Sequence, residues 1–352
     1  MTTVPRVTRS TTRKAISESK VKLSEPSQLP FAAKARRIEE EEHIPQKKRP
    51  KRVSQPVNQH LKANSQETTR PFRLSEAQAH LADIDPRFSL LFGRLPCGPF
   101  DSLSKPAVHQ PPEPFRNLCC SILGQQVSCM AARSITYQFI KIFQSGLPQK
   151  LEPSKKLSEF QFPSPSEVSN TSLPTLRTAG LSQRKAEYIH DLAQRFVDRR
   201  LEPQTLMSMD PNMVVDELCK VRGIGRWTAE MFLIFCVKHP DILPHADLAI
   251  QKGILRWYTT AAFDGSLLRH LKNDTCTGAE KEERDTTGLS TPPIPSDCSL
   301  SRQDLARRLS KPLKPGLFLT PSEMEQLTEQ WKPYRSLPVC YMWSLTGFIP
   351  EC

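Results

Sequence analysis

Nine residues decide the fold of this chain: VRGIGRWTA, at positions 221–229. Gly223 and Gly225 within this run can adopt positive φ at little steric cost, and they leave the neighbouring backbone amides uncovered. Before the run, residues 210–221 begin with Asp-Pro, a favourable helix start, and carry apolar residues at helical spacing. After it, residues 231–237 are apolar on every side, which predicts a buried helix. The sequence therefore predicts two helices joined by a glycine hairpin, whose free amides are suited to bind an anion such as a DNA phosphate.

Three more segments accompany the hairpin along the chain. They are LGQQVS at residues 123–128, LPHADL at residues 243–248 and WKPYRS at residues 331–336. Together with the hairpin they resemble the helix-hairpin-helix superfamily of DNA glycosylases, whose motif ends in Gly/Pro and a catalytic Asp, and specifically its 3-methyladenine DNA glycosylases. The resemblance covers roughly residues 75–350. It implies a monomeric base-excision repair enzyme that hydrolyses the N-glycosidic bond of alkylated purines, such as 3-methyladenine and 7-methylguanine, in double-stranded DNA.

Helical patterns dominate the chain after residue 72. Apolar residues recur at i, i+3 and i+4 in residues 115–123 and 182–196, and alternating strand patterns are scarce. We therefore expect an all-α domain at residues 73–352, with two helical lobes flanking a cleft and the helix-hairpin-helix motif at its mouth. Residues 264–317 differ, because they are rich in Thr, Ser, Pro and acidic residues. This composition predicts a flexible insertion, with a short helix at residues 301–309.

The segment before this domain, residues 1–72, carries most of the net charge. It has 16 Lys and Arg against 7 Asp and Glu, a net of +9 out of +12 for the whole chain. The segment is poor in aromatic residues and rich in Ser, Thr, Pro and Gln, so we expect a disordered basic tail. The basic pI therefore belongs mostly to the tail and does not by itself indicate a DNA-binding fold.

Within this tail lies one compact basic cluster. It consists of Lys47, Lys48, Arg49, Lys51 and Arg52. A solvated run of charge is the plainer interpretation, and a nuclear-import signal that also touches the DNA backbone is the functional one. Because the cluster precedes a domain that resembles DNA glycosylases, we expect import and a nuclear location.

No membrane segment and no iron–sulfur cluster are expected. No stretch reaches the ~18 apolar residues of a membrane span, and the start of the chain lacks an apolar core of signal-peptide length. The ten cysteines include no CxxC pair, which is typical of a reducing compartment. Some members of the superfamily hold an iron–sulfur cluster with four closely spaced cysteines after the catalytic segment, but only Cys340 and Cys352 lie near this C-terminus.

The resemblance also implies that the hairpin could bind a monovalent cation. Hairpins of the superfamily bind a monovalent cation, Na⁺ or K⁺, through backbone carbonyls, which here would include those of Val221 and Ile224. Carbonyl ligands leave no side-chain pattern in the sequence. We expect no other cofactor.

A base inside a duplex is reached only after its nucleotide is flipped into a pocket, while a side chain fills the vacated stack. Gln125 and Gln126 lie at the break between two predicted helices, and by resemblance Gln126 is the wedge. The alternative is a pair of exposed loop amides. Gly223 and Gly225, together with Arg226, are the predicted clamp on the DNA backbone.

Asp247 is the predicted catalytic residue. Departure of the base gives the sugar oxocarbenium character, and a nearby carboxylate stabilises that charge or activates water. Taken alone, an Asp before residues 248–250 is more typical of a helix N-cap. In register with the hairpin, catalysis is the favoured interpretation, and both roles can coexist.

Two tryptophans and a methionine are assigned to the base pocket by resemblance. Trp227 stands where bifunctional relatives place a lysine, and an indole cannot form a Schiff base, so hydrolysis without strand cleavage is expected. Trp227 and Trp343 match pocket-lining aromatic positions, where an indole face favours a cationic purine by ~1–2 kcal/mol. Ordinary core packing is the alternative for both. Met231 stands where some relatives have tyrosine, which leaves the range of excised bases open.

Two other functions remain open at this stage. One is a glycosylase for oxidised, deaminated or mismatched bases, although Trp227 and the missing cluster cysteines disfavour the commonest of these. The other is a non-catalytic helix-hairpin-helix module that only binds DNA. Asp247 separates the classes, because a binding module has no need of a carboxylate in that register.

Overall fold

The structure is a computed structural model that describes residues 72–104, 112–260 and 291–346. Within these ranges the chain is helical and forms no strand. An isolated β-bridge joins Lys314 and Leu317. The predicted all-α fold is confirmed. None of the described helices is long and apolar enough to cross a membrane.

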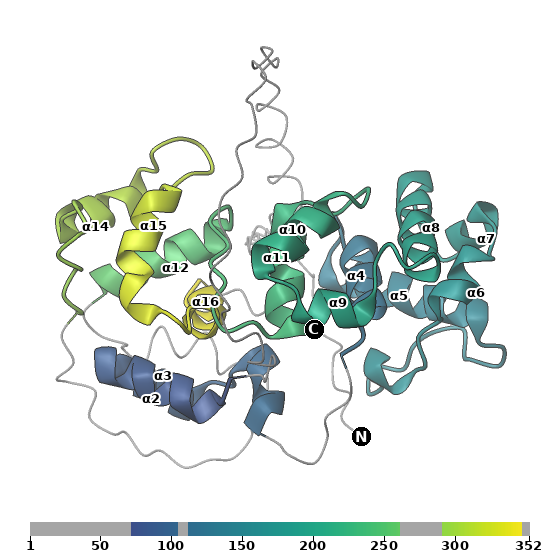
Figure 1. Ribbon diagram of the computed structural model, residues 1–352, viewed down its shortest axis with the longest axis horizontal. Helices are drawn as coiled ribbons and strands as arrows, with labels where there is room; N and C mark the ends of the chain where they lie inside the picture. The colour runs from purple at the N-terminus through teal and green to yellow at the C-terminus, as the bar shows by residue number, and fades with distance from the viewer. Residues whose placement is uncertain (1–71, 105–111, 261–290, 347–352) are drawn as a thin grey trace, which may run out of the picture.

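One group of helices is organised around α4 and α8 and includes the helix-hairpin-helix, at the right of Figure 1. Its members are α4 (Pro114–Leu123), α5 (Cys129–Phe143), η2 (Leu157–Glu159), α6 (Pro165–Ser169), α7 (Leu173–Arg177), α8 (Gln183–Val197), α9 (Pro203–Ser208), α10 (Pro211–Cys219), α11 (Arg226–Phe232) and the π-helical turn η3 (Leu233–Val237).

The second group is organised around α12, at the left of Figure 1. Its members are α2 (Leu74–Ile84), α3 (Arg87–Arg94), η1 (Gly98–Ser104), α12 (Leu248–Thr259), α14 (Arg302–Ser310), α15 (Pro321–Thr328), η4 (Glu329–Trp331) and α16 (Ser336–Ser344). The first part of the chain thus packs with its last part, on the side of the fold away from α8. The buried apolar side chains of both groups form one continuous core.

The two helices of the hairpin form for the local reasons that the sequence indicates. Asp210 caps α10, because its Oδ1 accepts the backbone N–H of Asn212 at 2.9 Å and Pro211 occupies the first helical position. After the hairpin, α11 is buried along most of its length, as predicted. It does not continue as one regular helix, since it widens into η3 and ends where Lys238 adopts a left-handed φ of 58°.

The end of the predicted insertion belongs to the packed fold. Residues 302–310 form α14, which is capped by Ser301 and packs on α12 with Leu305 fully buried. Arg308 makes a two-pronged ion pair with Glu323 at the start of α15. Residues 264–290, the first part of that insertion, lie outside the described residues.

Phe72 is the one residue of the predicted tail that the structure describes. Its ring packs against the rings of Phe100 and Tyr334, at centroid distances of 5.4 and 5.7 Å. The rest of the tail lies outside the described residues, so the domain boundaries stay predictions.

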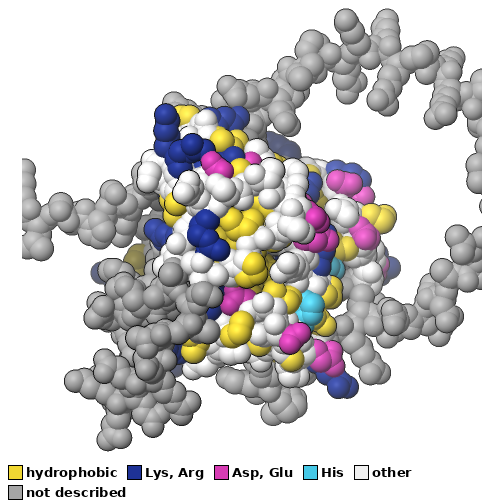
Figure 2. All heavy atoms as spheres, turned by 90° about the vertical axis from the view of Figure 1, so that its left-hand side faces the viewer, with side chains coloured by type: hydrophobic (Ala, Val, Ile, Leu, Met, Phe, Trp, Pro, Cys, Tyr) yellow, Lys and Arg dark blue, Asp and Glu magenta, His cyan; other side chains and the backbone are white. Residues whose placement is uncertain are grey.

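The surface of the α12 group carries interspersed charges. Figure 2 faces this side of the molecule, where Lys and Arg side chains lie close to Asp and Glu side chains. On α14, Arg307 pairs with Asp304 of the same helix, in addition to the pair between Arg308 and Glu323. These two arginines of α14 therefore each have an acidic partner within the group.

A single glycine allows α12 and α16 to approach each other. A Cβ at Gly253 would lie 2.5 Å from the backbone oxygen of Met342, a contact that requires the backbone to shift. This packing matters for the site, because α12 begins directly after Asp247 and Trp343 follows Met342 on α16.

We expect Gly253→Ala to lower the free energy of unfolding by about 1–3 kcal/mol, because the added methyl group overpacks this contact. The matched control is Gly93→Ala on α3, where a Cβ would meet nothing within 4 Å. That control should be neutral or stabilising by up to about 1 kcal/mol. Thermal or urea unfolding of both variants tests this, and equal effects would show that the two helices have room to separate.

Candidate active site

The hairpin depends on Gly223 more than on Gly225. Gly223 has a φ of +87°, and a Cβ there would lie 2.2 Å from the ring of Tyr188, which approaches from α8. Both its conformation and its lack of a side chain are therefore required. Gly225 has a φ of −99° and serves as the N-cap of α11 without a side-chain cap, so of the two glycines only Gly223 uses the positive φ that glycine permits.

The loop between α4 and α5 is tied to this hairpin. Nε2 of Gln125 donates to the backbone oxygen of Gly223 at 2.7 Å, across 98 residues of sequence. Gln126 is exposed and has a φ of +59°, which is an uncommon conformation for a residue other than glycine. The structure thus separates the two amides, since Gln125 holds the loop in place and Gln126 is presented to solvent.

Asp247 is almost completely enclosed by hydrogen-bond donors. Its Oδ1 accepts the backbone N–H groups of Ala249 at 2.8 Å and Ile250 at 3.1 Å. Its Oδ2 accepts the indole N–H groups of Trp227 at 2.9 Å and Trp343 at 3.1 Å. Four donors occupy the roughly four lone-pair positions of a carboxylate, and the residue is only 2% exposed. The structure shows the N-cap role that the sequence left open, and the catalytic role stays a prediction.

The two indoles are held differently. Trp343 is 1% exposed, and Phe235 stacks on it at a centroid distance of 5.8 Å with an interplanar angle of 18°. Trp227, at the start of α11, is only partly buried. Met231 lies one helical turn after Trp227 and is buried in the core. The structure therefore joins Trp227 and Trp343 through the carboxylate of Asp247, a connection that the sequence did not indicate.

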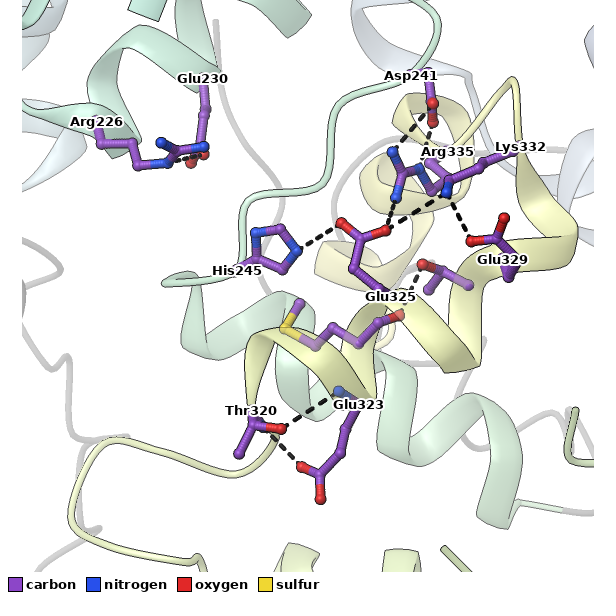
Figure 3. Close-up of polar contacts among 12 residues, drawn as sticks. Arg226, Glu230, Asp241, His245, Thr320, Glu323, Glu325, Glu329, Lys332 and Arg335 are labelled. Atoms are coloured by element: carbon purple, nitrogen blue, oxygen red, sulfur yellow. Dashed lines mark hydrogen bonds and ion pairs between the residues drawn. The ribbon is translucent and has the colours of Figure 1, made fainter. Parts of the chain in front are cut away.

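The loop that leads to Asp247 is anchored to the C-terminal helices. The backbone N–H of Ile242 donates to Oγ of Ser336 at 2.9 Å. Arg335 forms ion pairs with Asp241 of the loop and with Glu325 of α15. Figure 3 shows these side chains meeting between the loop and the helices.

His245 extends this network to within two residues of Asp247. Its Nε2 lies 2.9 Å from Oε1 of Glu325, and its backbone oxygen accepts Nε2 of Gln251 at 2.7 Å. Burial lowers the pKa of the His245 ring, and the charge of Glu325 opposes that shift. His245 is thus a hydrogen-bonded part of the anchor.

Two exposed arginines flank the hairpin glycines. The side chain of Arg222 is 62% exposed, pairs with Glu187 at 3.3 Å and lies over the ring of Tyr188 at 5.7 Å. The side chain of Arg226 is 65% exposed and pairs with Glu230 at 3.0 Å. Both side chains are exposed beside the hairpin and paired with a carboxylate, and the role of Arg226 in a phosphate clamp stays a prediction.

Glu230 is the residue that the sequence reasoning missed. It lies on α11, is 4% exposed, and has Arg226 as its hydrogen-bond partner. Burial raises its pKa to about 7, the charge of Arg226 opposes the shift, and the charge of Asp247 adds to it. A single acidic residue in the otherwise apolar stretch after Trp227 was the signal that could have revealed it.

We expect Trp343→Phe to lower the free energy of unfolding by about 1.5–3 kcal/mol, because it removes a hydrogen bond to a charged group. The loss of indole volume adds to this value, so the same change is also made in the Asp247→Ala variant. A coupling energy above about 1 kcal/mol in this double-mutant cycle would isolate the hydrogen bond. A coupling near zero would mean that Trp343 contributes by packing alone.

Comparisons with known proteins agree on one family. The chain matches the family described as HhH-GPD superfamily base excision DNA repair protein over residues 119–272. It is 28% identical over 187 residues to DNA-3-methyladenine glycosylase 1 of Schizosaccharomyces pombe, which covers 51% of this chain and 71% of that protein. It is 24% identical over 271 residues to the alkylbase DNA glycosidase-like protein mag2 of the same organism, which covers 76% of this chain and 92% of that protein.

Among solved structures, the S. pombe 3-methyladenine DNA glycosylase in complex with abasic DNA superimposes with a TM-score of 0.46. The sequence identity is 22%, and the alignment covers 76% of this chain and 95% of that one. The family match includes the hairpin, the Gln125–Gln126 loop and Asp247, which are the parts that the geometry brings together. Residues 119–272 of the chain thus form a region of the helix-hairpin-helix/GPD type found in base-excision DNA repair proteins.

Proposed function

We propose that this protein is a monofunctional DNA glycosylase that removes alkylated purines, 3-methyladenine and 7-methylguanine among them, from double-stranded DNA in base-excision repair. It acts as a monomer in this proposal. The observation that carries the proposal is the carboxylate of Asp247, which two backbone N–H groups and two indole N–H groups hold beside the hairpin. The substrate class is supported by the names of the S. pombe relatives.

The four donors suggest how Asp247 acts. A carboxylate that activates water must accept a hydrogen bond from that water, and here each lone-pair position already has a donor. Its negative charge remains available to a sugar that gains positive charge as the base leaves. In our proposal the N-glycosidic bond breaks first, and Asp247 stabilises the resulting oxocarbenium ion by its charge. Water then adds to the sugar and releases its proton to solvent.

The surrounding residues have supporting roles in this proposal. Gln126, exposed and with positive φ, fills the stack when the damaged nucleotide flips out. Trp227, with its indole edge bonded to Asp247, offers its face to a cationic base. Trp343 is 1% exposed with Phe235 stacked on it, so its role is to hold Asp247. Because Trp227 replaces a possible lysine nucleophile, the product is an intact strand with an abasic site.

We also propose a monovalent cation, Na⁺ or K⁺, at the hairpin. The carbonyl oxygen of Val221 accepts the N–H of Ile224 at 3.1 Å, and in the described residues no N–H donates to the carbonyl of Ile224. Both oxygens have lone pairs left, so they fit such an ion, which would add positive charge where the phosphate is proposed to bind. In the described ranges no group of three or more His, Cys, Asp or Glu side chains is arranged to hold a metal ion. That the protein has no iron–sulfur cluster stays a prediction.

Asp247→Asn tests the proposed reaction. We expect release of methylated purines to fall by about 10²–10³-fold in single-turnover assays, because the charge beside the sugar is lost. Wild-type product should be an abasic strand that breaks only after alkali. Excision by the variant within a few-fold of wild type, or strand breakage by wild type without alkali, would contradict the proposal.

The structure also identifies the control that this variant needs. The amide NH₂ of an asparagine would face either two indole or two backbone N–H groups, so some loss of stability is expected. Asp210→Asn changes the N-cap of α10, whose carboxylate accepts only one backbone N–H. For both variants we measure thermal unfolding and binding to DNA that contains an abasic-site analogue. These measurements distinguish a loss of catalysis from a loss of folded structure.

We propose further that the protein enters the nucleus through the basic cluster of the N-terminal tail, which lies outside the described residues. The cluster consists of Lys47, Lys48, Arg49, Lys51 and Arg52. Replacing all five with alanine should move a fluorescently tagged protein from the nucleus to the cytoplasm. An unchanged nuclear signal would refute this role.

A further inference from the structure

The ion pair between Arg226 and Glu230 joins an exposed base to a buried acid. Nε of Arg226 lies 3.0 Å from Oε1 of Glu230, and the side chains are 65% and 6% exposed. Figure 3 shows the two side chains lying together along α11. Within the described residues, the side chain of Glu230 forms its hydrogen bond and its ion pair with Arg226. A carboxylate that is buried to this extent depends on its partner to remain charged.

The position of Arg226 gives it a second possible partner. It directly follows the hairpin, where our proposed function places a DNA phosphate. A guanidinium binds phosphate through strong, charge-assisted hydrogen bonds, and the side chain of Arg226 is mostly exposed to solvent. A bound phosphate would therefore compete with Glu230 for Arg226.

Burial and two charged groups, Arg226 and Asp247, determine whether Glu230 is charged. Burial and the charge of Asp247 both raise the pKa of Glu230, and Arg226 is the group that lowers it. His245, in the loop before α12, has Glu325 as its hydrogen-bond partner and is not among the groups that shift the pKa of Glu230. Once Arg226 turns away, the remaining influences in the described residues favour the neutral acid.

We propose that Arg226 exchanges its buried partner Glu230 for a DNA phosphate when the protein binds DNA, and that the carboxylate of Glu230 then takes up a proton from solvent. Glu230 is in this view a positioning residue, which holds Arg226 along α11 until DNA arrives. The inference rests on the proposed function, because that function supplies the phosphate.

The exchange predicts a specific dependence of DNA affinity on pH. In the free protein the pKa of Glu230 is about 7, and loss of Arg226 raises it in the complex. Between these two pKa values binding takes up protons, so affinity falls as pH rises, by at most tenfold per pH unit. Below the pKa of the free protein Glu230 is already protonated before DNA binds, so it no longer makes the affinity depend on pH.

The experiment measures binding of the full chain to a duplex that contains a tetrahydrofuran abasic-site analogue, which cannot be excised. Dissociation constants are determined from about pH 6.5 to about pH 8.5, and calorimetry in two buffers of different ionisation enthalpy counts the protons taken up. In Glu230→Gln the side chain keeps its shape and is always neutral. This variant should bind as wild type at the lower pH and several-fold more tightly than wild type at the higher pH.

The hairpin offers a matched control in the pair of Arg222 and Glu187. Arg222 is about as exposed as Arg226, but Glu187 is 31% exposed, so water stabilises its charge whether or not Arg222 leaves. Glu187→Gln should therefore shift affinity equally at every pH and leave proton uptake as in wild type. Arg226→Ala is the second variant, which should bind weakly and take up fewer protons, because Glu230 then lacks its partner in both states.

Equal pH dependence and equal proton uptake in wild type and Glu230→Gln would overturn the exchange, because Arg226 would then keep its buried partner in the complex. If Glu230→Gln does not fold, unchanged proton uptake in Arg226→Ala overturns it instead. Failure of the proposed function has a different signature. In that case wild type shows the predicted proton uptake on the analogue duplex but releases no methylated base.

Discussion

The hydrogen bonds to the carboxylate of Asp247 connect elements that are far apart in the sequence. Oδ1 caps the N-terminus of α12 by accepting two of its free backbone N–H groups. Oδ2 accepts the indole N–H of Trp227 from α11 and that of Trp343 from α16. A buried charge without partners would cost several kcal/mol, so α11 and α16 must stay close enough to supply their donors. The close contact at Gly253 and the anchored loop before Asp247 both serve this requirement, because each limits how far α12 can move from α16.

Much of the fold follows from short-range patterns. Asp210-Pro211 predicts the start of α10, and the apolar run after the hairpin predicts a buried helix, both from neighbours within one or two turns. The short helix predicted at residues 301–309 is present as α14, but the sequence did not indicate that it packs on α12 with Leu305 buried. Leu305 and Leu309 stand among charged and polar residues, and two leucines are too weak a pattern to show that the segment packs.

The candidate site is only partly visible in the sequence, because its decisive contacts are long-range. The bond from Gln125 to the oxygen of Gly223 spans 98 residues, and that from Trp343 to Asp247 spans 96. Residue type alone suggests that an indole stacks or packs, and gives no indication that its N–H meets a particular carboxylate. Glu230 was missed for a related reason, since its burial depends on α4 and α10 packing around α11.

The most direct test of the central interaction is the NMR signal of the four tryptophan indole N–H groups. In wild type, those of Trp227 and Trp343 donate to a buried carboxylate, whereas Trp257 and Trp331 lie elsewhere in the core. We predict that Asp247→Ala shifts the signals of Trp227 and Trp343 and speeds their exchange with solvent far more than those of Trp257 and Trp331. Unchanged signals for Trp227 and Trp343 would show that neither indole is bonded to Asp247 in solution.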